Sequence, residues 1–195
     1  MMREPHDDRD SMKVWLDESE VVQLLERAED STHRLALALG ARSGLRSAEV
    51  VDVAPVDVVD GPAGTMLRVP DGKGGKYRET PVPDDVATRI ETIADVRDVD
   101  QDAPLVDVTT RTLRRWVTRY GAVLADETDD VGWRDLSYHD LRRTWATLLA
   151  NESEVDPLVV CRWGGWADLE TFLDHYRGAH SPAVQRRERS KVDWL

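Results

Sequence analysis

The chain has 195 residues, long enough for one domain with a hydrophobic core, and 38 acidic against 26 basic side chains give a net charge of −12. A single cysteine, Cys161, excludes an internal disulfide framework and a zinc site built only from cysteines. No apolar run reaches the ~20 residues of a membrane span and no signal peptide opens the chain, so we expect a soluble, cytoplasmic protein.

Residues 1–13 are polar and acidic without periodicity, and we expect a disordered lead-in there, before a domain over residues 14–195. Apolar residues at helical spacing then predict helices at about 17–28, 31–41, 46–53, 83–94, 109–125, 139–150, 155–162, 167–176 and 182–190. Residues 55–83 differ, because short valine-rich runs are broken by glycines, which predicts a small antiparallel three-stranded sheet with a glycine-rich hairpin. The fold class expected is α+β, mainly α-helical.

The charged residues have an unusual composition. Asp outnumbers Glu by 25 to 13, and Arg outnumbers Lys by 22 to 4. A large acidic excess with scarce lysine is typical of proteins from a high-salt cytoplasm, where salt screens self-repulsion. A GC-rich genome that favours Asp, Val, Ala and Arg is the alternative. Under either interpretation the net charge no longer argues against a nucleic-acid partner, and only local basic clusters are informative.

Three segments carry residues suited to chemistry. The first reads SGLRSAE over residues 43–49. Its glycine can end one helix, and Arg46 then begins the next with Glu49 three residues on, on the same helix face. A surface ion pair is the simplest interpretation of this pair on its own.

The second segment reads DGKGGKYRETPVP over residues 71–83. Two of the four lysines, Lys73 and Lys76, lie on this one hairpin, although a flexible, solubilising turn would also explain them. The sequence argues against a nucleotide-type phosphate loop, because the Gly-x-x-x-x-Gly-Lys-Ser/Thr pattern is missing and the segment leads into a strand.

The third segment reads LSYHDLRRTWAT over residues 136–147. His139 and Arg142 lie three residues apart in the first turn of a predicted helix, where the macrodipole and free N–H groups favour an anion. Leu141 and Trp145 fall on the opposite, buried face. A histidine and an arginine one turn apart at a helix start make a better phosphate site than either alone.

These three segments, in this order, resemble the motifs of the tyrosine recombinase (phage integrase) family. Residues 163–176, with WGGW followed by Tyr176, resemble the last motif, in which Trp166 takes a position that is usually histidine and is tryptophan in some members. Tyr176 follows Trp166 by ten residues, whereas the family spacing is about nine. The resemblance covers residues 14–190, which correspond to the catalytic domain, and we expect the N-terminal core-binding domain of the family to be absent.

The resemblance implies the catalytic-domain fold of this family and a site-specific DNA recombinase or integrase that needs neither metal, cofactor nor ATP. The catalytic residues that it implies are Arg46, Lys73, His139, Arg142, Trp166 and Tyr176. Arginine is permanently charged and bidentate, so Arg46 and Arg142 are assigned to the scissile phosphate. Tyr176 would be the nucleophile of a 3′-phosphotyrosyl intermediate, and Lys73 the general acid.

His139 would assist proton transfer and stabilise the phosphate. Trp166 would offer its indole N–H to a phosphate oxygen and pack against the nucleophile segment. From the residues alone, Glu49 is expected to orient Arg46 or to stabilise its helix, and not to take part in the chemistry. Double-stranded DNA is the expected partner, and the candidate DNA-contacting residues are Lys76, Arg111, Arg114, Arg115, Arg119 and Arg143. For Arg143 a salt bridge is an equal alternative. The basic tail ending in Trp194 could mediate self-association on DNA.

The composition and resemblance together indicate a haloarchaeal or haloarchaeal-virus type of enzyme. Two other functions stay open at this point. The chain could be a non-catalytic DNA-binding relic or accessory protein of the same fold, which the expected absence of the core-binding domain and the ten-residue spacing from Trp166 to Tyr176 both suggest. It could also be a type IB topoisomerase-like nicking enzyme, which shares the phosphotyrosine chemistry but exchanges no partner strands.

Overall fold

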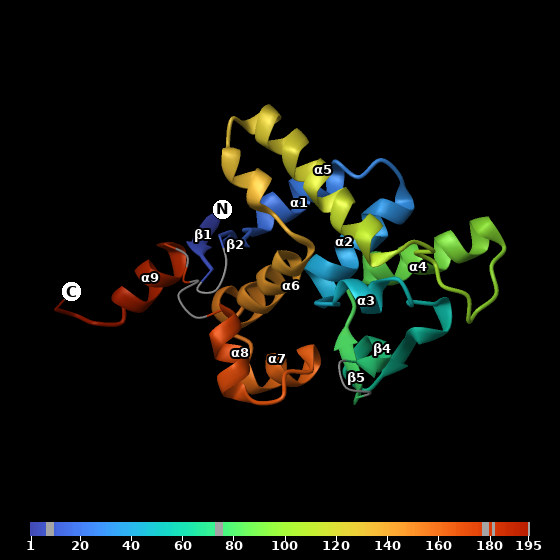
Figure 1. Cartoon of the computed structure of the whole chain (residues 1–195). Helices are drawn as coiled ribbons and strands as arrows, with labels where there is room; N and C mark the ends of the chain where they lie inside the picture. Colours follow the sequence, from blue (N-terminus) through green and yellow to red (C-terminus); the bar gives the residue numbers. More distant parts are fainter. Residues whose placement is uncertain (7–9, 73–75, 177–179, 181, 195) are drawn as a thin grey trace.

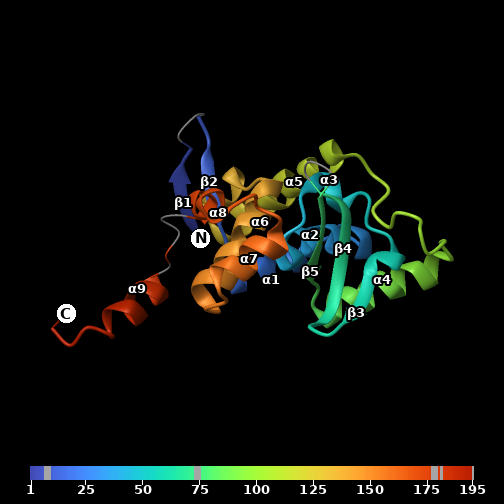
Figure 2. The same cartoon turned by 90° about the horizontal axis from the view of Figure 1, so that it is seen from below.

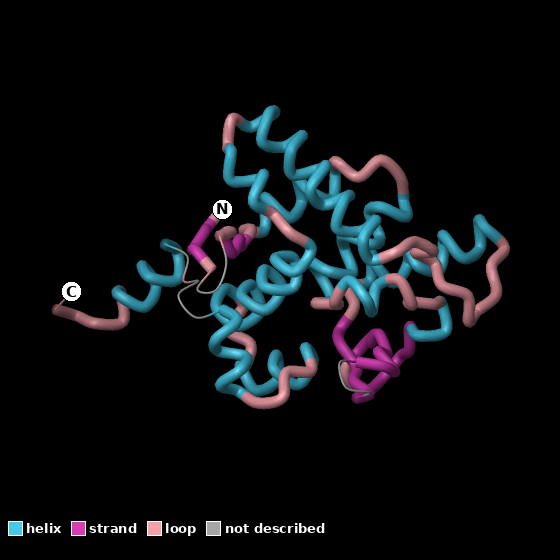
Figure 3. The backbone as a smooth tube through the Cα atoms, in the orientation of Figure 1, coloured by secondary structure: helices cyan, strands magenta, loops and turns pink. Residues whose placement is uncertain are grey.

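The structure is a computed structural model that describes residues 1–6, 10–72, 76–176, 180 and 182–194 (Figure 1). It is mainly helical, with two small antiparallel sheets, which confirms the predicted α+β class (Figure 3). The α-helices are α1 (Glu18–Glu26), α2 (Ser31–Ser43), α3 (Ser47–Val50), α4 (Asp84–Arg97), α5 (Thr110–Thr128), α6 (Tyr138–Thr147), α7 (Pro157–Gly164), α8 (Leu169–Tyr176) and α9 (Pro182–Arg189). No helix in these described ranges is both long and apolar enough to span a membrane.

The first residues correct one prediction. Strands β1 (Met2–Pro5) and β2 (Met12–Trp15) pair in an antiparallel sheet where a disordered lead-in was expected. The reason is tertiary: the backbone N–H groups of Val14 and Leu16 donate to Asp140 Oδ1 at 3.2 Å and Thr144 Oγ1 at 3.0 Å, both on α6. A strand of four residues is too short to show a clear alternation, so contacts from a distant helix decide its conformation.

The predicted three-stranded sheet is confirmed. Its strands are β3 (Val58–Gly61), β4 (Gly64–Gly72) and β5 (Lys76–Pro81), all antiparallel in the order β3-β4-β5. The sheet lies at one end of the molecule beside α3 and α4 (Figure 2). The hydroxyl of Thr80 on β5 donates to the Ser43 carbonyl at 2.9 Å, which fastens the sheet to the end of α2.

Helix α2 lies at the centre of the core, and its residues 35–41 are all buried. It packs closely against α6 because residue 40 is a glycine: a Cβ there would lie 2.9 Å from the Tyr138 hydroxyl oxygen. That hydroxyl donates to the Ala36 carbonyl, and burial raises the pKa of Tyr138 well above its ordinary value. Tyr138 therefore stays neutral and fixes the first turn of α6 against α2.

A second, smaller core joins α6, α7 and α8. Its buried members are Trp145, Ala146, Val160, Cys161 and Phe172. Three short elements complete the fold. The 3-10 turn η1 (Pro55–Asp57) precedes the sheet, the 3-10 turn η2 (Val131–Asp135) lies between α5 and α6, and the π-helical turn η3 (Leu148–Glu152) follows α6. Helix α9 lies at the edge of the molecule, where Arg187 donates to the Asn151 carbonyl at 2.9 Å and pairs with Glu154, and the C-terminal end of the chain lies beyond it (Figures 1 and 2).

Candidate phosphate-binding site

The turn between α2 and α3 places Arg46. Gly44 ends α2 in the left-handed conformation, with φ of +68°, and Arg46 is the N-cap of α3. The Glu49 carboxylate accepts the Arg46 backbone N–H at 2.7 Å and its Nη1 at 2.8 Å. Glu49 therefore orients Arg46 and caps the helix at the same time, as the sequence predicts.

Sequence analysis missed Arg78, a second partner of Glu49. Its Nη1 and Nη2 atoms donate to the two Glu49 oxygens at 2.8 and 2.7 Å, and its Nε donates to the Trp163 carbonyl at 3.0 Å. The side chain is only 8% exposed. A usable signal was present, because Arg78 shares the inward face of β5 with buried Thr80, while Tyr77 and Glu79 are exposed.

The protonation of Glu49 follows from these contacts. Burial alone would raise the pKa of this carboxyl, but the hydrogen bonds and charge of Arg78, helped by the bonds from Arg46, lower it to about 2. Glu49 is therefore ionised at neutral pH, and it neutralises only part of the positive charge that surrounds it.

Arg142 is the deepest arginine of the site, with 2% of its surface exposed. It donates to the main-chain carbonyls of Gly44 and Gly164, and its guanidinium lies 4.1 Å from the centre of the Trp166 ring. Burial, and then the neighbouring charges of Arg46 and Arg78, lower its pKa well below the usual value. A guanidinium keeps its proton even so, and this unfavourable charge is one that an incoming anion would stabilise.

Trp166 lies between two aromatic rings. Its ring stacks on that of Trp145, with ring centroids 6.3 Å apart, and makes an edge-to-face contact with Phe172, with ring centroids 4.8 Å apart. Phe172 belongs to α8, so Trp166 packs against the helix that ends at Tyr176, as expected. Gly164 allows this placement, because a Cβ there would lie 1.7 Å from the Trp166 ring.

The remaining predicted catalytic residues are placed less fully. His139 is exposed in the first turn of α6, on the helix that carries Arg142. Tyr176 is the last residue of α8, but its side chain, like that of Lys76, lies outside the described part of the structure. Lys73 itself lies outside the described residues.

The assembled groups form a cationic site. Three guanidinium groups and one carboxylate leave two net positive charges around Arg46, Arg78 and Arg142. Guanidinium groups bind tetrahedral oxyanions through paired N–H donors, so the arrangement suits a phosphate. Among the described residues, no three His, Cys, Asp or Glu side chains are placed to hold a metal ion together.

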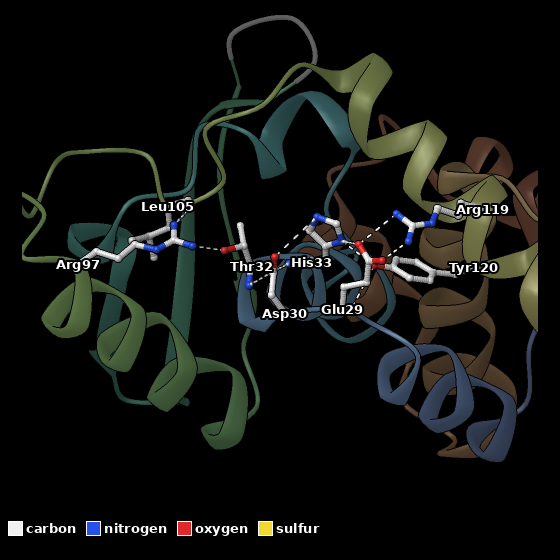
Figure 4. Close-up of polar contacts among 8 residues, drawn as sticks. All are labelled: Glu29, Asp30, Thr32, His33, Arg97, Leu105, Arg119 and Tyr120. Atoms are coloured by element: carbon white, nitrogen blue, oxygen red, sulfur yellow. Dashed lines mark hydrogen bonds and ion pairs between the residues drawn. The ribbon is translucent and has the colours of Figure 1, made fainter.

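The candidate DNA-contacting arginines divide into two groups. Arg111, Arg114 and Arg115 are exposed on α5. Arg119 is also exposed, but both of its terminal nitrogens donate to Glu29, which lies beside Tyr120 and His33 (Figure 4).

Arg143, by contrast, is buried and paired with Asp140 one turn earlier on α6. Of its two predicted roles, the structure therefore shows the salt bridge.

Comparison with known proteins shows the family of this chain. Residues 14–181 match the Phage integrase family. The chain belongs to the phage integrase family. A search of curated proteins finds no match to this phage integrase chain.

Solved structures share the fold. XerA recombinase matches with a TM-score of 0.72 and 21% identity, over 91% of this phage integrase chain and 64% of XerA. XerH site-specific recombinase, bound to a palindromic difH substrate in a post-cleavage complex, matches with a TM-score of 0.66 and 22% identity, over 92% of this chain and 52% of XerH. The catalytic domain of bacteriophage HP1 integrase matches with a TM-score of 0.60 and 17% identity, over 93% of this chain and 96% of that domain. The chain thus spans about half to two thirds of the two Xer structures.

Proposed function

We propose that this chain is the catalytic domain of a site-specific DNA recombinase or integrase that cleaves and rejoins DNA through a 3′-phosphotyrosyl intermediate. The observation that carries the proposal is the group of Arg46, Arg78 and Arg142 around a single carboxylate, beside the tryptophan that packs on the helix ending at Tyr176. The net charge of this group, about +2, matches the two negative charges that a phosphodiester carries in the transition state.

In the reaction, the Tyr176 oxygen attacks the scissile phosphorus in line and loses its proton. A bond from that oxygen to phosphorus forms as the bond to the 5′ oxygen breaks, and Lys73 supplies the proton that the leaving 5′ oxygen needs. Arg46 and Arg142 bind the non-bridging oxygens, where negative charge accumulates. The reverse attack by a 5′ hydroxyl rejoins the strand, so the energy of the phosphodiester bond is conserved without ATP.

His139 and Trp166 complete this site. His139, exposed in the first turn of α6, would take part in moving the tyrosine proton and would bond a phosphate oxygen. The indole N–H of Trp166 would serve as a further neutral donor. The protein groups alone supply this chemistry, so no metal or cofactor is assigned to it.

The proposed partner is double-stranded DNA, bound along the exposed arginines of α5 with help from Lys76 on the hairpin. XerH is described as bound to a difH substrate, and Tn1549 integrase as bound to transposon right end DNA, which supports the same kind of partner for this fold. We also propose self-association on DNA through the C-terminal tail. The position of the tail at the edge of the molecule, with Trp194 84% exposed, supports that role.

The test is covalent trapping. The protein is incubated with a randomised library of nicked duplexes, from which a cleaved end diffuses away, and SDS-resistant protein–DNA adducts are recovered and sequenced. We expect an adduct at a defined sequence, and none with Tyr176→Phe. Tyr77→Phe is the matched control, because Tyr77 is an exposed tyrosine of β5 with no place in the site.

The outcomes separate the alternatives. DNA binding without any adduct would support a non-catalytic DNA-binding relic and overturn the proposal. Adducts that relax supercoiled DNA but never join two duplexes would support a nicking enzyme of the topoisomerase type. An adduct that survives Tyr176→Phe would show that another residue is the nucleophile.

We further propose a high-salt cytoplasm as the working environment, supported by 25 Asp against only 4 Lys in a chain of net charge −12. Self-repulsion among these charges acts over a Debye length of about 10 Å at 0.1 M salt and about 3 Å at 1 M. The thermal midpoint should therefore rise as KCl increases from about 0.1 M to above 1 M. A melting series against KCl measures this, and a flat or falling midpoint would leave codon bias as the explanation.

A further inference from the structure

The Glu49 carboxylate has its hydrogen-bonding capacity filled. An ionised carboxylate offers about four acceptor positions. Oε1 accepts Nη1 of Arg46 and Nη1 of Arg78, both at 2.8 Å, and Oε2 accepts the Arg46 backbone N–H and Nη2 of Arg78, both at 2.7 Å. Two of the four positions are therefore taken by Arg46 and two by Arg78.

We propose that Arg78 is a positioning residue of the phosphate site, which acts through Glu49 to leave Arg46 available to the scissile phosphate. The inference rests on the function proposed above. Arg46 gives Glu49 only one of its guanidinium nitrogens, Nη1, and within the described part of the chain its Nε and Nη2 make no hydrogen bond. Those donors are the ones that a phosphate can use in bidentate fashion.

Loss of Arg78 would change how the Glu49 carboxylate shares its acceptor positions. The buried Glu49 carboxylate would have two empty acceptor positions and no second cation, and Arg46 would be the nearest partner able to satisfy it. Glu49 would then compete with phosphate for the Arg46 donors, and the net charge of the site would fall from about +2 to about +1. Arg78 thus determines how strongly Arg46 acts on an anion without needing to contact it.

Arg78 also ties this carboxylate to the Trp166 side of the site. Its Nε–H donates to the Trp163 carbonyl, and the chain turns at Gly165, where a Cβ would lie 2.8 Å from Cδ of Arg78. One planar guanidinium makes all three bonds at once. Lysine has a single nitrogen on a flexible stem and cannot reproduce this geometry, so Arg78→Lys should restore charge but only part of the function.

The test is a cycle of variants on the duplex recovered in the trapping experiment. Single-turnover cleavage at saturating DNA is measured for wild type, Arg46→Ala, Arg78→Gln and the double variant, with DNA affinity measured separately. We expect Arg78→Gln to slow cleavage by about 10-fold or more with less than about 3-fold change in affinity. In the Arg46→Ala background the same change should cost less than about 3-fold, because the residue through which Arg78 acts is gone.

Two further variants distinguish a loss of cleavage from a loss of folding. Arg68→Gln removes an arginine from β4 whose cross-strand partner is Glu79, on the opposite face of the sheet from Arg78, and it should cleave like wild type. Glu49→Gln combined with Arg78→Gln removes the competing charge, so it should cleave faster than Arg78→Gln alone at a temperature where both are folded. Independent, multiplicative effects of Arg46→Ala and Arg78→Gln, or an equal loss with Arg68→Gln, would overturn the proposal.

A measurement without cleavage separates this proposal from the proposed function. Inorganic phosphate at about 50 mM, against chloride at equal ionic strength, should raise the melting temperature of wild type, since a ligand that binds only the folded state stabilises it. Arg78→Gln and Arg46→Ala should each lose most of that rise, and Arg68→Gln should keep it. If Arg78→Gln keeps the rise, or wild type shows none, the positioning role fails whether or not the protein cleaves DNA.

Discussion

Replacing Glu49 by glutamine should remove a defined, acid-sensitive part of the stability. Burial opposes the charge of this carboxyl, but Arg78 and Arg46 lower its pKa to about 2, from an ordinary value of 4.5. A shift of this size corresponds to roughly 3 kcal/mol of folding free energy at neutral pH. The side chain is 6% exposed, so solvent screens the contribution little.

The direction of the pH dependence follows from proton binding. Below pH 4.5 the unfolded chain binds a proton at Glu49 that the folded chain does not bind, so acid favours unfolding. The contribution is complete above about pH 5.5, has lost about 1 kcal/mol by pH 4, and disappears as the pH approaches 2. Glu49→Gln should therefore be less stable than wild type by roughly 3 kcal/mol at pH 7, with a difference that narrows as the pH falls.

Urea unfolding at a series of pH values between 7 and 4, at constant ionic strength, measures this difference. Glu127→Gln is the control, because Glu127 pairs with Arg27 on the surface and both side chains are more than 40% exposed. Glu127→Gln should change the free energy of unfolding by close to zero at every pH. A Glu49→Gln difference that is independent of pH would refute the reasoning, since it would show that the ionised carboxylate is not what stabilises the fold.

Two other variants test the packing and the DNA surface. Gly44→Ala should destabilise the protein by about 2–4 kcal/mol in urea unfolding, since φ is +68° and the new Cβ would lie 2.3 Å from the Trp145 ring. Gly64→Ala is the control, because φ is +99° there but the space around it is open, and it should destabilise by only about 1 kcal/mol. Equal losses of stability in the two variants would contradict the packing argument. Glu29→Gln should release Arg119 for DNA and steepen the slope of log affinity against log salt by about 0.9, whereas Glu127→Gln, the same charge change, should not. An unchanged slope for Glu29→Gln would place Arg119 away from the DNA.

Much of the fold could be predicted because its helices carry local signals. Asp30 before α2, Gly44 after it and Pro157 at the start of α7 mark helix ends by their own chemistry, and the structure has all three at those ends. The β1–β2 sheet has no such signal, since α6 supplies the side chains that fix it.

The candidate site was only partly predictable for a related reason. The pair of Arg46 and Glu49 is local, and its contact follows from helical spacing. Arg78 reaches Glu49 across 29 residues and Arg142 reaches Gly44 across 98 residues, so neither contact has a pattern within one segment. Strand alternation could have shown that Arg78 points inward, but it could not have shown which carboxylate it meets.

The bonds that hold Arg142 have a consequence for how this chain can diverge. Both acceptors, at Gly44 and Gly164, are main-chain carbonyls, which every amino acid supplies. A side-chain acceptor disappears with one codon change, whereas these two survive any replacement that leaves the backbone path intact. Tolerance to mutation around this guanidinium should therefore be broad, and fragility should concentrate at the two glycines, because a Cβ at either would collide with a tryptophan ring.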